Sequence, residues 1–150
     1  MNGLLIVNKE KDMTSRDVVN VICKKFKTRR VGHSGTLDPI ATGVLVVAIG
    51  NYTKLIDILS SSYKEYVATL KLGIQTDTLD ITGNVIDEKP FGVDKELIED
   101  TLYSFLGKSI QEVPKYSAVK INGKKLYEYA RDNIDIELPK REIEVRNWII

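Results

Sequence analysis

The hydrophobic positions in the first third of the chain follow distinct patterns. Residues 3–7 are almost all apolar, which predicts a short buried strand. Apolar residues then recur at helical spacing over residues 15–26, after a Thr14–Asp17 pair of the kind that begins helices. Residues 44–49 are apolar without interruption and lie between two glycines, which predicts a strand buried on both faces. The sequence therefore predicts a strand, an amphipathic helix and a second strand, in this order.

The rest of the chain alternates irregularly between short strand and helix patterns. Strands are predicted at residues 66–72, 84–87, 116–121 and 143–150. Helices are predicted at residues 53–59, 94–106 and 126–131, the second with a core stripe of Leu97, Ile98, Leu102, Phe105 and Leu106. The polar segments 73–83 and 122–123 are typical of turns. These elements predict an α+β fold with a mixed, largely antiparallel sheet flanked by helices.

Composition narrows the class of protein further. The 150 residues suffice for one domain with a hydrophobic core, and 43% hydrophobic with 29% charged residues is an ordinary soluble composition. The single cysteine, Cys23, excludes an internal disulfide and a Cys-based zinc cluster, and the single histidine, His33, excludes a multi-His metal site. No apolar run is long enough for a signal-peptide core or a membrane span. We therefore expect a cytoplasmic protein.

Charge is concentrated after the first predicted helix. The net charge of +1 neither demands nor excludes a nucleic-acid partner, because the distribution of charge matters more than its sum. Residues 24–30 hold five basic side chains in seven positions. These side chains suit the negative end of the helix dipole as solvated residues, and they also suit contact with phosphate groups. The two interpretations are compatible.

The loop predicted at residues 32–43 is the segment best suited to chemistry. Its three glycines permit unusual backbone angles and close approach of a ligand. Asp38 precedes Pro39, which restricts the Asp38 backbone to extended conformations. One interpretation makes Asp38 a turn former that bonds its own backbone. The other makes it a catalytic carboxylate, with His33 as an acid/base partner or a surface residue.

Five ordered segments resemble a known family. Residues 31–44, Val-Gly-His-Ser-Gly-Thr-Leu-Asp-Pro-Ile-Ala-Thr-Gly-Val, resemble the catalytic motif of the TruB family of tRNA pseudouridine synthases. Four other segments match family motifs in the same order, namely residues 5–9 with 13–15, 64–66, 72–83 and 116–131. The chain departs from the family in Lys9-Glu-Lys-Asp12, where members usually have Lys-Pro-x-Gly, and in Val113-Pro114, where members often have a proline pair. The resemblance covers only the first half of a usual member.

The resemblance implies a function and a set of site residues. Residues 1–150 would form a partial pseudouridine synthase catalytic domain, without the later part of that domain and without the C-terminal PUA domain. Asp38 would be the catalytic carboxylate, as nucleophile or base. His33 and Tyr66 would bind the substrate, although the pattern around Tyr66 also fits a core tyrosine. RNA contacts would come from Lys9, Lys64, Asp77, Lys120 and Lys124.

The resemblance also implies the partners. The substrate would be the T-loop uridine in the T-arm of tRNA, flipped out of its stack and isomerised to pseudouridine. No cofactor, metal or membrane is implied, and a monomer is expected. Two alternatives remain open: an RNA-binding fragment of such an enzyme without turnover, and an α+β protein with no RNA role.

Overall fold

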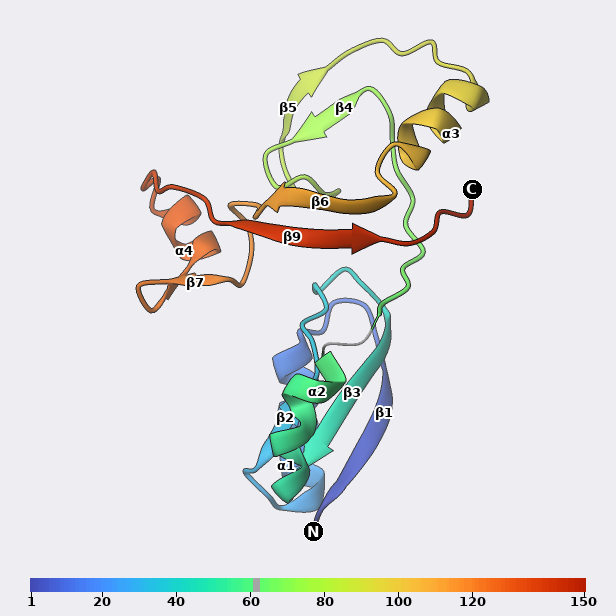
Figure 1. Ribbon diagram of the computed structural model, residues 1–150. Helices are drawn as coiled ribbons and strands as arrows, with labels where there is room; N and C mark the ends of the chain where they lie inside the picture. The colour runs from blue at the N-terminus through green and yellow to red at the C-terminus, as the bar shows by residue number, and fades with distance from the viewer. Residues whose placement is uncertain (61–62) are drawn as a thin grey trace. The chain divides into compact units, whose positions relative to one another are not determined.

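The computed structural model describes residues 1–60 and 63–150, and the chain divides into two compact units (Figure 1). Unit 1 is Met1–Val67 and unit 2 is Ala68–Ile150. The expected α+β class and the largely antiparallel pairing are confirmed. Within the described residues, the strands form four small antiparallel sheets.

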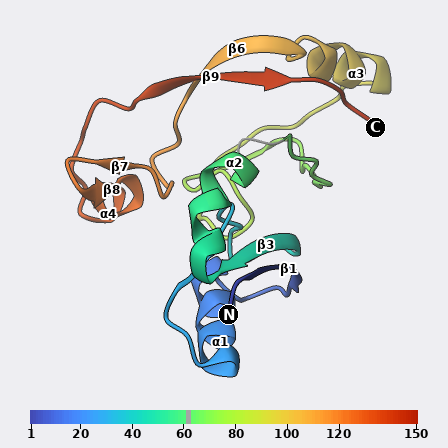
Figure 2. The same cartoon turned by 60° about the horizontal axis from the view of Figure 1, so that its bottom comes forward.

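Unit 1 is a three-stranded antiparallel sheet with helices. Its elements are β1 (Gly3–Lys9), α1 (Ser15–Phe26), β2 (Val31–His33), β3 (Gly43–Ile49), the 3-10 helix η1 (Gly50–Leu55) and α2 (Ile56–Ser60). The strand order is β1-β3-β2, and β1 pairs with β3 over its whole length (Figure 2). Helix α1 begins and ends at the predicted residues, because Thr14 and Asp17 form a complete capping box at its start. Lys27 ends it in the left-handed conformation.

The core of unit 1 lies between α1 and one face of this sheet. Val18 and Ile22 from α1 pack against Leu45, Val47 and Ile49 from β3, and all five are buried. The other face of the sheet is only partly covered. Here Ile56, the first residue of α2, lies against Gly32, which is paired with Ala48 in the neighbouring strand.

The sequence overstated the burial of both long strands. Val44 in β3 and Ile6 in β1 are each 69% exposed, although both strands were expected to be buried. Alternate residues of a strand point to opposite faces. Since α1 covers only one face, an apolar run does not by itself show burial on both.

Unit 2 consists of three antiparallel strand pairs and two helices. Its elements are β4 (Ile74–Thr76), β5 (Val85–Glu88), α3 (Lys95–Tyr103), β6 (Gly107–Glu112), β7 (Lys120–Ile121), β8 (Lys124–Lys125), α4 (Leu126–Arg131) and β9 (Lys140–Val145). The pairs are β4-β5, β6-β9 and β7-β8. The β6-β9 pair forms the long ribbon drawn in orange and red in Figure 1. Among the described hydrophobic residues of this unit, only Val113 and Leu126 are buried.

Two predictions, for residues 66–72 and for residues 94–106, differ from the structure. Residues 66–72 were predicted as a strand, but they form no regular element and are mostly exposed. The alternating pattern was present, but a strand also needs a neighbour, and no described strand pairs with this segment. The helix predicted at residues 94–106 ends earlier, at Tyr103, and its predicted core stripe is wrong. No residue of α3 is buried, Leu97 is 52% exposed, and Phe105, beyond the end of the helix, is 53% exposed.

The remaining strand boundaries moved because pairing, rather than local pattern, sets them. Only the last two residues of the predicted strand 116–121 are in a strand, and β9 begins at Lys140 and ends at Val145. Strand β6, which the sequence pattern did not indicate, pairs with β9 from Gly107 opposite Val145 to Glu112 opposite Lys140. This contact joins residues that lie 28 to 38 positions apart, so no local periodicity reveals it.

Candidate functional site

Asp38 lies in the connection between β2 and β3, and its side chain is exposed. Its carbonyl oxygen accepts a hydrogen bond from the Ala41 amide at 3.0 Å, which closes a turn over Pro39 and Ile40. The turn is therefore real. It is formed by the backbone of Asp38, and the carboxylate takes no part in it.

Ser15, the first residue of α1, holds the residue before Asp38. The Ser15 side chain is 2% exposed. Its Oγ accepts a hydrogen bond from the Leu37 amide at 2.9 Å and donates one to the Leu37 carbonyl at 3.3 Å. The Leu37 side chain packs against the core of unit 1. Leu37 is therefore fixed through its amide, its carbonyl and its side chain.

Lys9, the last residue of β1, contacts the residue after Asp38. Its side chain is 1% exposed, and its Nζ donates to the carbonyl oxygens of Met13 at 2.7 Å, Glu10 at 3.0 Å and Pro39 at 3.4 Å. The Pro39 carbonyl also accepts from the Asp12 amide at 2.8 Å. Buried ammonium groups need such partners, because leaving them unpaired is costly.

This placement changes the interpretation of Lys9. The sequence suggested an RNA contact, but the Lys9 ammonium lies inside unit 1 and is turned to backbone carbonyls. It thus ties the β1–α1 turn to the loop that carries Asp38. Ser15 and Lys9 hold this loop on either side of Asp38, and we call the two together the loop clamp.

His33 ends β2, five residues before Asp38. Its Nδ1 lies 2.8 Å from the Gly35 carbonyl oxygen, and the Ser34 amide donates to the Val46 carbonyl at 2.9 Å. A carbonyl oxygen only accepts, so Nδ1 carries the hydrogen in this contact. The imidazole at the end of β2 is thereby tied to the loop that carries Asp38, and its Nε2 is the nitrogen that this contact leaves for a ligand.

Tyr66 and Lys64 lie beyond α2, in the segment without regular structure. Tyr66 is 69% exposed, so the alternative of a core tyrosine is wrong in this structure. The Lys64 ammonium donates to the Ser60 carbonyl oxygen at 2.8 Å. An exposed phenol ring in an irregular segment is available for stacking on a base.

The predicted turn at residues 73–83 holds itself together with its carboxylates. Asp80 Oδ1 accepts from the Thr82 amide at 2.8 Å, the Thr82 hydroxyl at 2.6 Å and the Thr78 hydroxyl at 2.8 Å. These bonds, above all that from the Thr82 hydroxyl, lower the pKa of Asp80 below its ordinary value. Asp77 accepts from the Asn84 amide at 2.9 Å and its side-chain amide at 3.2 Å.

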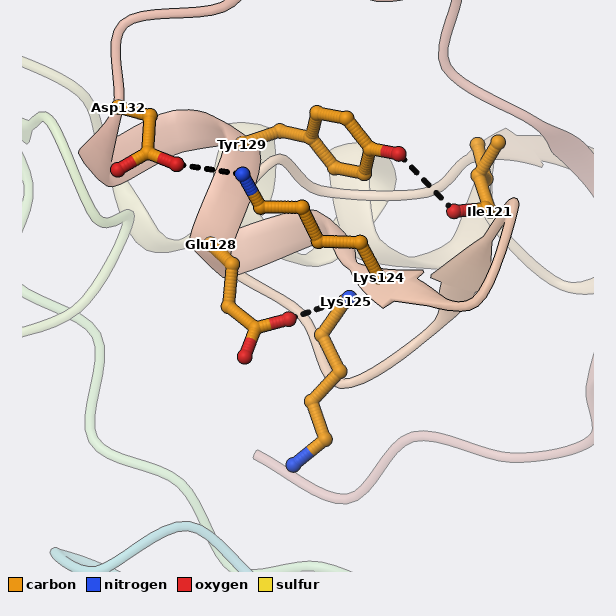
Figure 3. Close-up of polar contacts among 6 residues, drawn as sticks. All are labelled: Ile121, Lys124, Lys125, Glu128, Tyr129 and Asp132. Carbon is orange, nitrogen blue, oxygen red and sulfur yellow. Dashed lines mark hydrogen bonds and ion pairs between the residues drawn. The ribbon is translucent and has the colours of Figure 1, made fainter.

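The two lysines of the β7–β8 hairpin that were predicted to contact RNA differ in their surroundings. Lys120 is exposed, whereas Lys124 forms an ion pair with Asp132 at 2.5 Å (Figure 3). This hydrogen bond raises the pKa of Lys124. The Lys124 ammonium also lies 4.9 Å from the centre of the Tyr129 ring, whose hydroxyl donates to the Ile121 carbonyl at 3.1 Å.

The helix that follows begins with a further charged contact. The Lys125 amide donates to Glu128 Oε2 at 2.7 Å at the start of α4 (Figure 3). Lys125 and Arg131 both approach the face of Tyr127, with 5.2 Å to the ring centre in each case. Tyrosines and cations are thus interleaved on this small module, β7–β8–α4, a composition that suits RNA phosphates and bases.

The structure thus places His33 at the start of the loop that carries Asp38 and distributes the other candidates over both units. Lys64 and Tyr66 belong to unit 1, and Asp77, Lys120 and Lys124 belong to unit 2. Sequence reasoning missed Ser15 and Asp80. No local signal indicates Ser15, because its partner Leu37 lies 22 positions away. Asp80 did have a signal, since a carboxylate between threonines is typical of a turn that bonds its own side chains.

The described part of the chain has neither a metal-ligating cluster nor a membrane-spanning helix. In residues 1–60 and 63–150, no group of three or more His, Cys, Asp or Glu side chains is placed to hold a metal ion. No helix among these residues is long and apolar enough to cross a membrane.

Comparison with known proteins places the chain in a family. A family model described as TruB family pseudouridylate synthase (N terminal domain) matches residues 23–150. The tRNA pseudouridine synthase B of Caldicellulosiruptor saccharolyticus is 51% identical over 140 residues, which are 93% of this chain and 48% of the relative. The protein of the same name from Bacillus subtilis is 47% identical over 149 residues, which are 98% of this chain and 48% of the relative.

A solved structure agrees with this match. In the crystal structure of a Cbf5-Nop10-Gar1 complex, one chain aligns with a TM-score of 0.53 and 26% identity, over 79% of this chain and 31% of that chain. With the family match, this likeness confirms the expected pseudouridine synthase fold. The chain spans about half the length of the curated relatives it matches. It belongs to the TruB family of pseudouridylate synthases and corresponds to that family's N-terminal domain.

Proposed function

We propose that this chain forms part of the catalytic domain of a tRNA pseudouridine synthase and that Asp38 is the catalytic carboxylate. The observation that carries the proposal is the placement of Asp38. Its side chain is exposed, yet Ser15 fixes the residue before it and Lys9 contacts the residue after it. A reactive group on a rigidly held loop meets the positional demand of catalysis. The family match supports pseudouridine formation as the reaction.

The proposed reaction is an isomerisation. The bond between C1′ of the ribose and N1 of uracil breaks, the base turns, and C1′ bonds to C5, which loses its hydrogen while N1 gains one. Nothing is oxidised or reduced, so the chemistry requires no redox cofactor. An aspartate carboxylate serves such a reaction as a nucleophile toward carbon or as a base that removes a proton.

The target uridine has to leave its stack in the T-loop before it reaches Asp38. Extruding a base costs on the order of a few kcal/mol. Stacking on an aromatic ring returns about 1–3 kcal/mol per base, and Tyr66 offers an exposed ring for it. We assign to His33 the positioning of the base, through the imidazole nitrogen that Gly35 does not occupy.

Phosphate contacts come from exposed cations rather than from Lys9. Lys64 and Lys120 are exposed, and Lys124, which is partly exposed, lies beside Tyr129 in the β7–β8–α4 module. We assign to Asp77 an indirect part, since it fixes the turn that contains it. Such contacts recognise the shape of folded RNA and its backbone charge. A tRNA substrate implies action in the cytoplasm, and we propose a monomer.

The test of this proposal is an assay for loss of the C5 hydrogen. A T-arm RNA that carries tritium at C5 of its uridines releases tritium when C5 bonds to C1′. In the longest natural chain that contains these residues, Asp38→Asn is expected to abolish release while RNA affinity changes little. Full tritium release by Asp38→Asn would refute the assignment.

A second function has one observation in its favour. Because the chain covers 48% of its relatives' length, residues 1–150 alone could bind RNA without turnover. The same tritium assay on residues 1–150, under conditions where a gel-shift experiment shows the T-arm RNA fully bound, separates the two. Turnover by this chain alone would reject the binding fragment, whereas saturable binding without release would support it.

A further inference from the structure

We propose that Ser15 is a positioning residue for Asp38. The proposal rests on the function assigned to Asp38 above. It concerns a residue that does not touch the substrate, since the Ser15 side chain is 2% exposed. Its effect on the reaction would pass through Leu37, the neighbour of Asp38 in the chain.

The Ser15 hydroxyl is not occupied by the helix that carries it. The exposed end of α1 is capped by Thr14, whose side chain accepts from the Asp17 amide at 3.0 Å, and by Asp17, which accepts from the Thr14 amide at 2.9 Å. Ser15 Oγ is therefore left to act on the loop. The capping box fixes the first turn of α1, so this hydroxyl is presented from a rigid element.

A hydroxyl is suited to this contact because it accepts and donates at the same time. Toward Leu37 it does both, with the amide at 2.9 Å and the carbonyl at 3.3 Å. Because the two bonds join one oxygen to both backbone polar groups of Leu37, they restrict the orientation of the Leu37 backbone as well as its distance from Ser15. An alanine at position 15 would leave the Leu37 amide and carbonyl without these partners.

The restriction reaches Asp38 through the backbone. The Leu37 carbonyl belongs to the peptide plane that also contains the Asp38 amide, and that plane is rigid. Pro39 limits the Asp38 backbone from the other side. With both flanking peptides held, the remaining freedom of the carboxylate is mainly that of its own side chain.

Loss of the hydroxyl should therefore affect the chemical step more than RNA binding. A displacement of about 1 Å in a reacting group costs on the order of 100-fold in rate. For Ser15→Ala we expect kcat to fall about 10- to 100-fold and KM for the RNA to change less than about twofold. A group that acts only on the geometry of the transition state gives this kinetic signature.

The experiment compares two neighbouring substitutions in the longest natural chain. Ser15→Ala removes the contact with Leu37, whereas Thr14→Ala removes the helix cap and leaves Leu37 untouched. Thr14→Ala, which loses an N-cap, should reduce stability by about 1 kcal/mol but keep kcat within about twofold. Ser15→Thr retains the hydroxyl and should restore kcat toward that of the unmodified protein. Tritium release gives kcat and KM for each.

Amide hydrogen exchange provides a second readout that does not depend on catalysis. In the unmodified protein the Leu37 amide should exchange more slowly than that of exposed Thr36, and in Ser15→Ala this protection should fall about tenfold or more. If Ser15→Ala does not fold, Leu37 exchange in the unmodified protein and kcat of Ser15→Thr decide. Rapid Leu37 exchange, or a kcat for Ser15→Thr reduced more than about 100-fold, would contradict the proposal.

The outcomes separate this inference from the proposed function. If Asp38→Asn abolishes turnover while folded Ser15→Ala retains kcat within about twofold, Asp38 is catalytic and Ser15 is not its positioning residue. If Asp38→Asn retains turnover, the proposed function fails, whatever Ser15→Ala does. If Ser15→Ala and Thr14→Ala lose kcat equally, the effect is one of stability and the positioning role is refuted.

Discussion

Replacing Lys9 with methionine tests the contribution of Lys9 to the loop clamp. Methionine has a similar length and keeps most of the apolar contacts of the lysine stem, but it cannot donate to the three carbonyl oxygens around Nζ. The change therefore isolates the ammonium. Lys11 lies two residues away in the same turn and is exposed, which makes Lys11→Met the matched control.

The expected cost follows from the contacts. The bonds to Met13 at 2.7 Å and Glu10 at 3.0 Å each contribute about 1.5–3 kcal/mol, as hydrogen bonds from a charged donor, and the contact to Pro39 at 3.4 Å adds little. Avoiding the burial of a charge offsets part of this loss. We expect Lys9→Met to lower the free energy of unfolding of unit 1 by about 2–4 kcal/mol, and Lys11→Met by less than about 0.5 kcal/mol.

Native-state amide exchange of β1 and β3 measures this loss in unit 1 itself. A cost of about 2–4 kcal/mol corresponds to exchange that is about 30- to 700-fold faster, at about 1.4 kcal/mol for each factor of ten. RNA binding gives the second readout. A lysine that contacts phosphate contributes to the salt dependence of binding. Because the buried Lys9 ammonium is expected to contact no phosphate, the slope of affinity against salt should be the same in Lys9→Met and the unmodified chain.

Two results would refute the interpretation of Lys9. Exchange in β1 and β3 as slow in Lys9→Met as in Lys11→Met would mean that the ammonium does not hold the turn. A salt slope reduced by about one in Lys9→Met, in a chain that stays folded, would restore the phosphate contact that the sequence suggested.

Three further predictions concern residues outside the clamp. Because the pKa of Asp80 is lowered, its carboxylate stabilises the turn above the unfolded pKa near 3.8, and this stabilisation is lost as the pH falls through the folded pKa. Exchange of the Thr82 amide should accelerate in that pH range, and Asp80→Asn should remove this pH dependence. Asp132→Asn should free the charge of Lys124 and tighten RNA binding at low salt, and no change in affinity would speak against a phosphate contact by Lys124. Gly50→Ala should destabilise unit 1 by about 2 kcal/mol in urea unfolding, because Gly50 has φ +64° and a Cβ there would collide with Asn2. Gly3→Ala is the control and should cost less, because a Cβ at Gly3 meets open space.

Local signals predicted the elements that depend on neighbouring residues. Helix α1 was predicted to the residue, because its capping box and its apolar spacing lie within the helix itself. The Asn122–Gly123 turn was predicted for the same reason, and both residues have the positive φ, 51° and 82°, that these residue types tolerate. Helix α4, Leu126–Arg131, was also predicted to the residue.

Contacts between distant residues were not predictable in this way. Strand β6 has few apolar residues, and its pairing with β9 depends on a partner far along the chain. The same limit applied to the candidate site. The motif identified Asp38 and His33 as candidates, but the burial of Lys9 and its contact with Pro39, 30 positions away, required the folded arrangement. Lysine is seldom fully buried, so its residue type suggested the surface.

The most direct test of the central claim is the single-turnover rate of pseudouridine formation in two carboxylate variants of the longest natural chain. Asp12 is exposed, lies in the β1–α1 turn and contacts Pro39 only through its backbone amide, and asparagine tolerates its φ of 67°. With T-arm RNA bound to saturation, we expect Asp12→Asn to retain the unmodified rate within about twofold and Asp38→Asn to form no detectable pseudouridine. Equal rates in the two variants would contradict the assignment of Asp38 as the catalytic carboxylate.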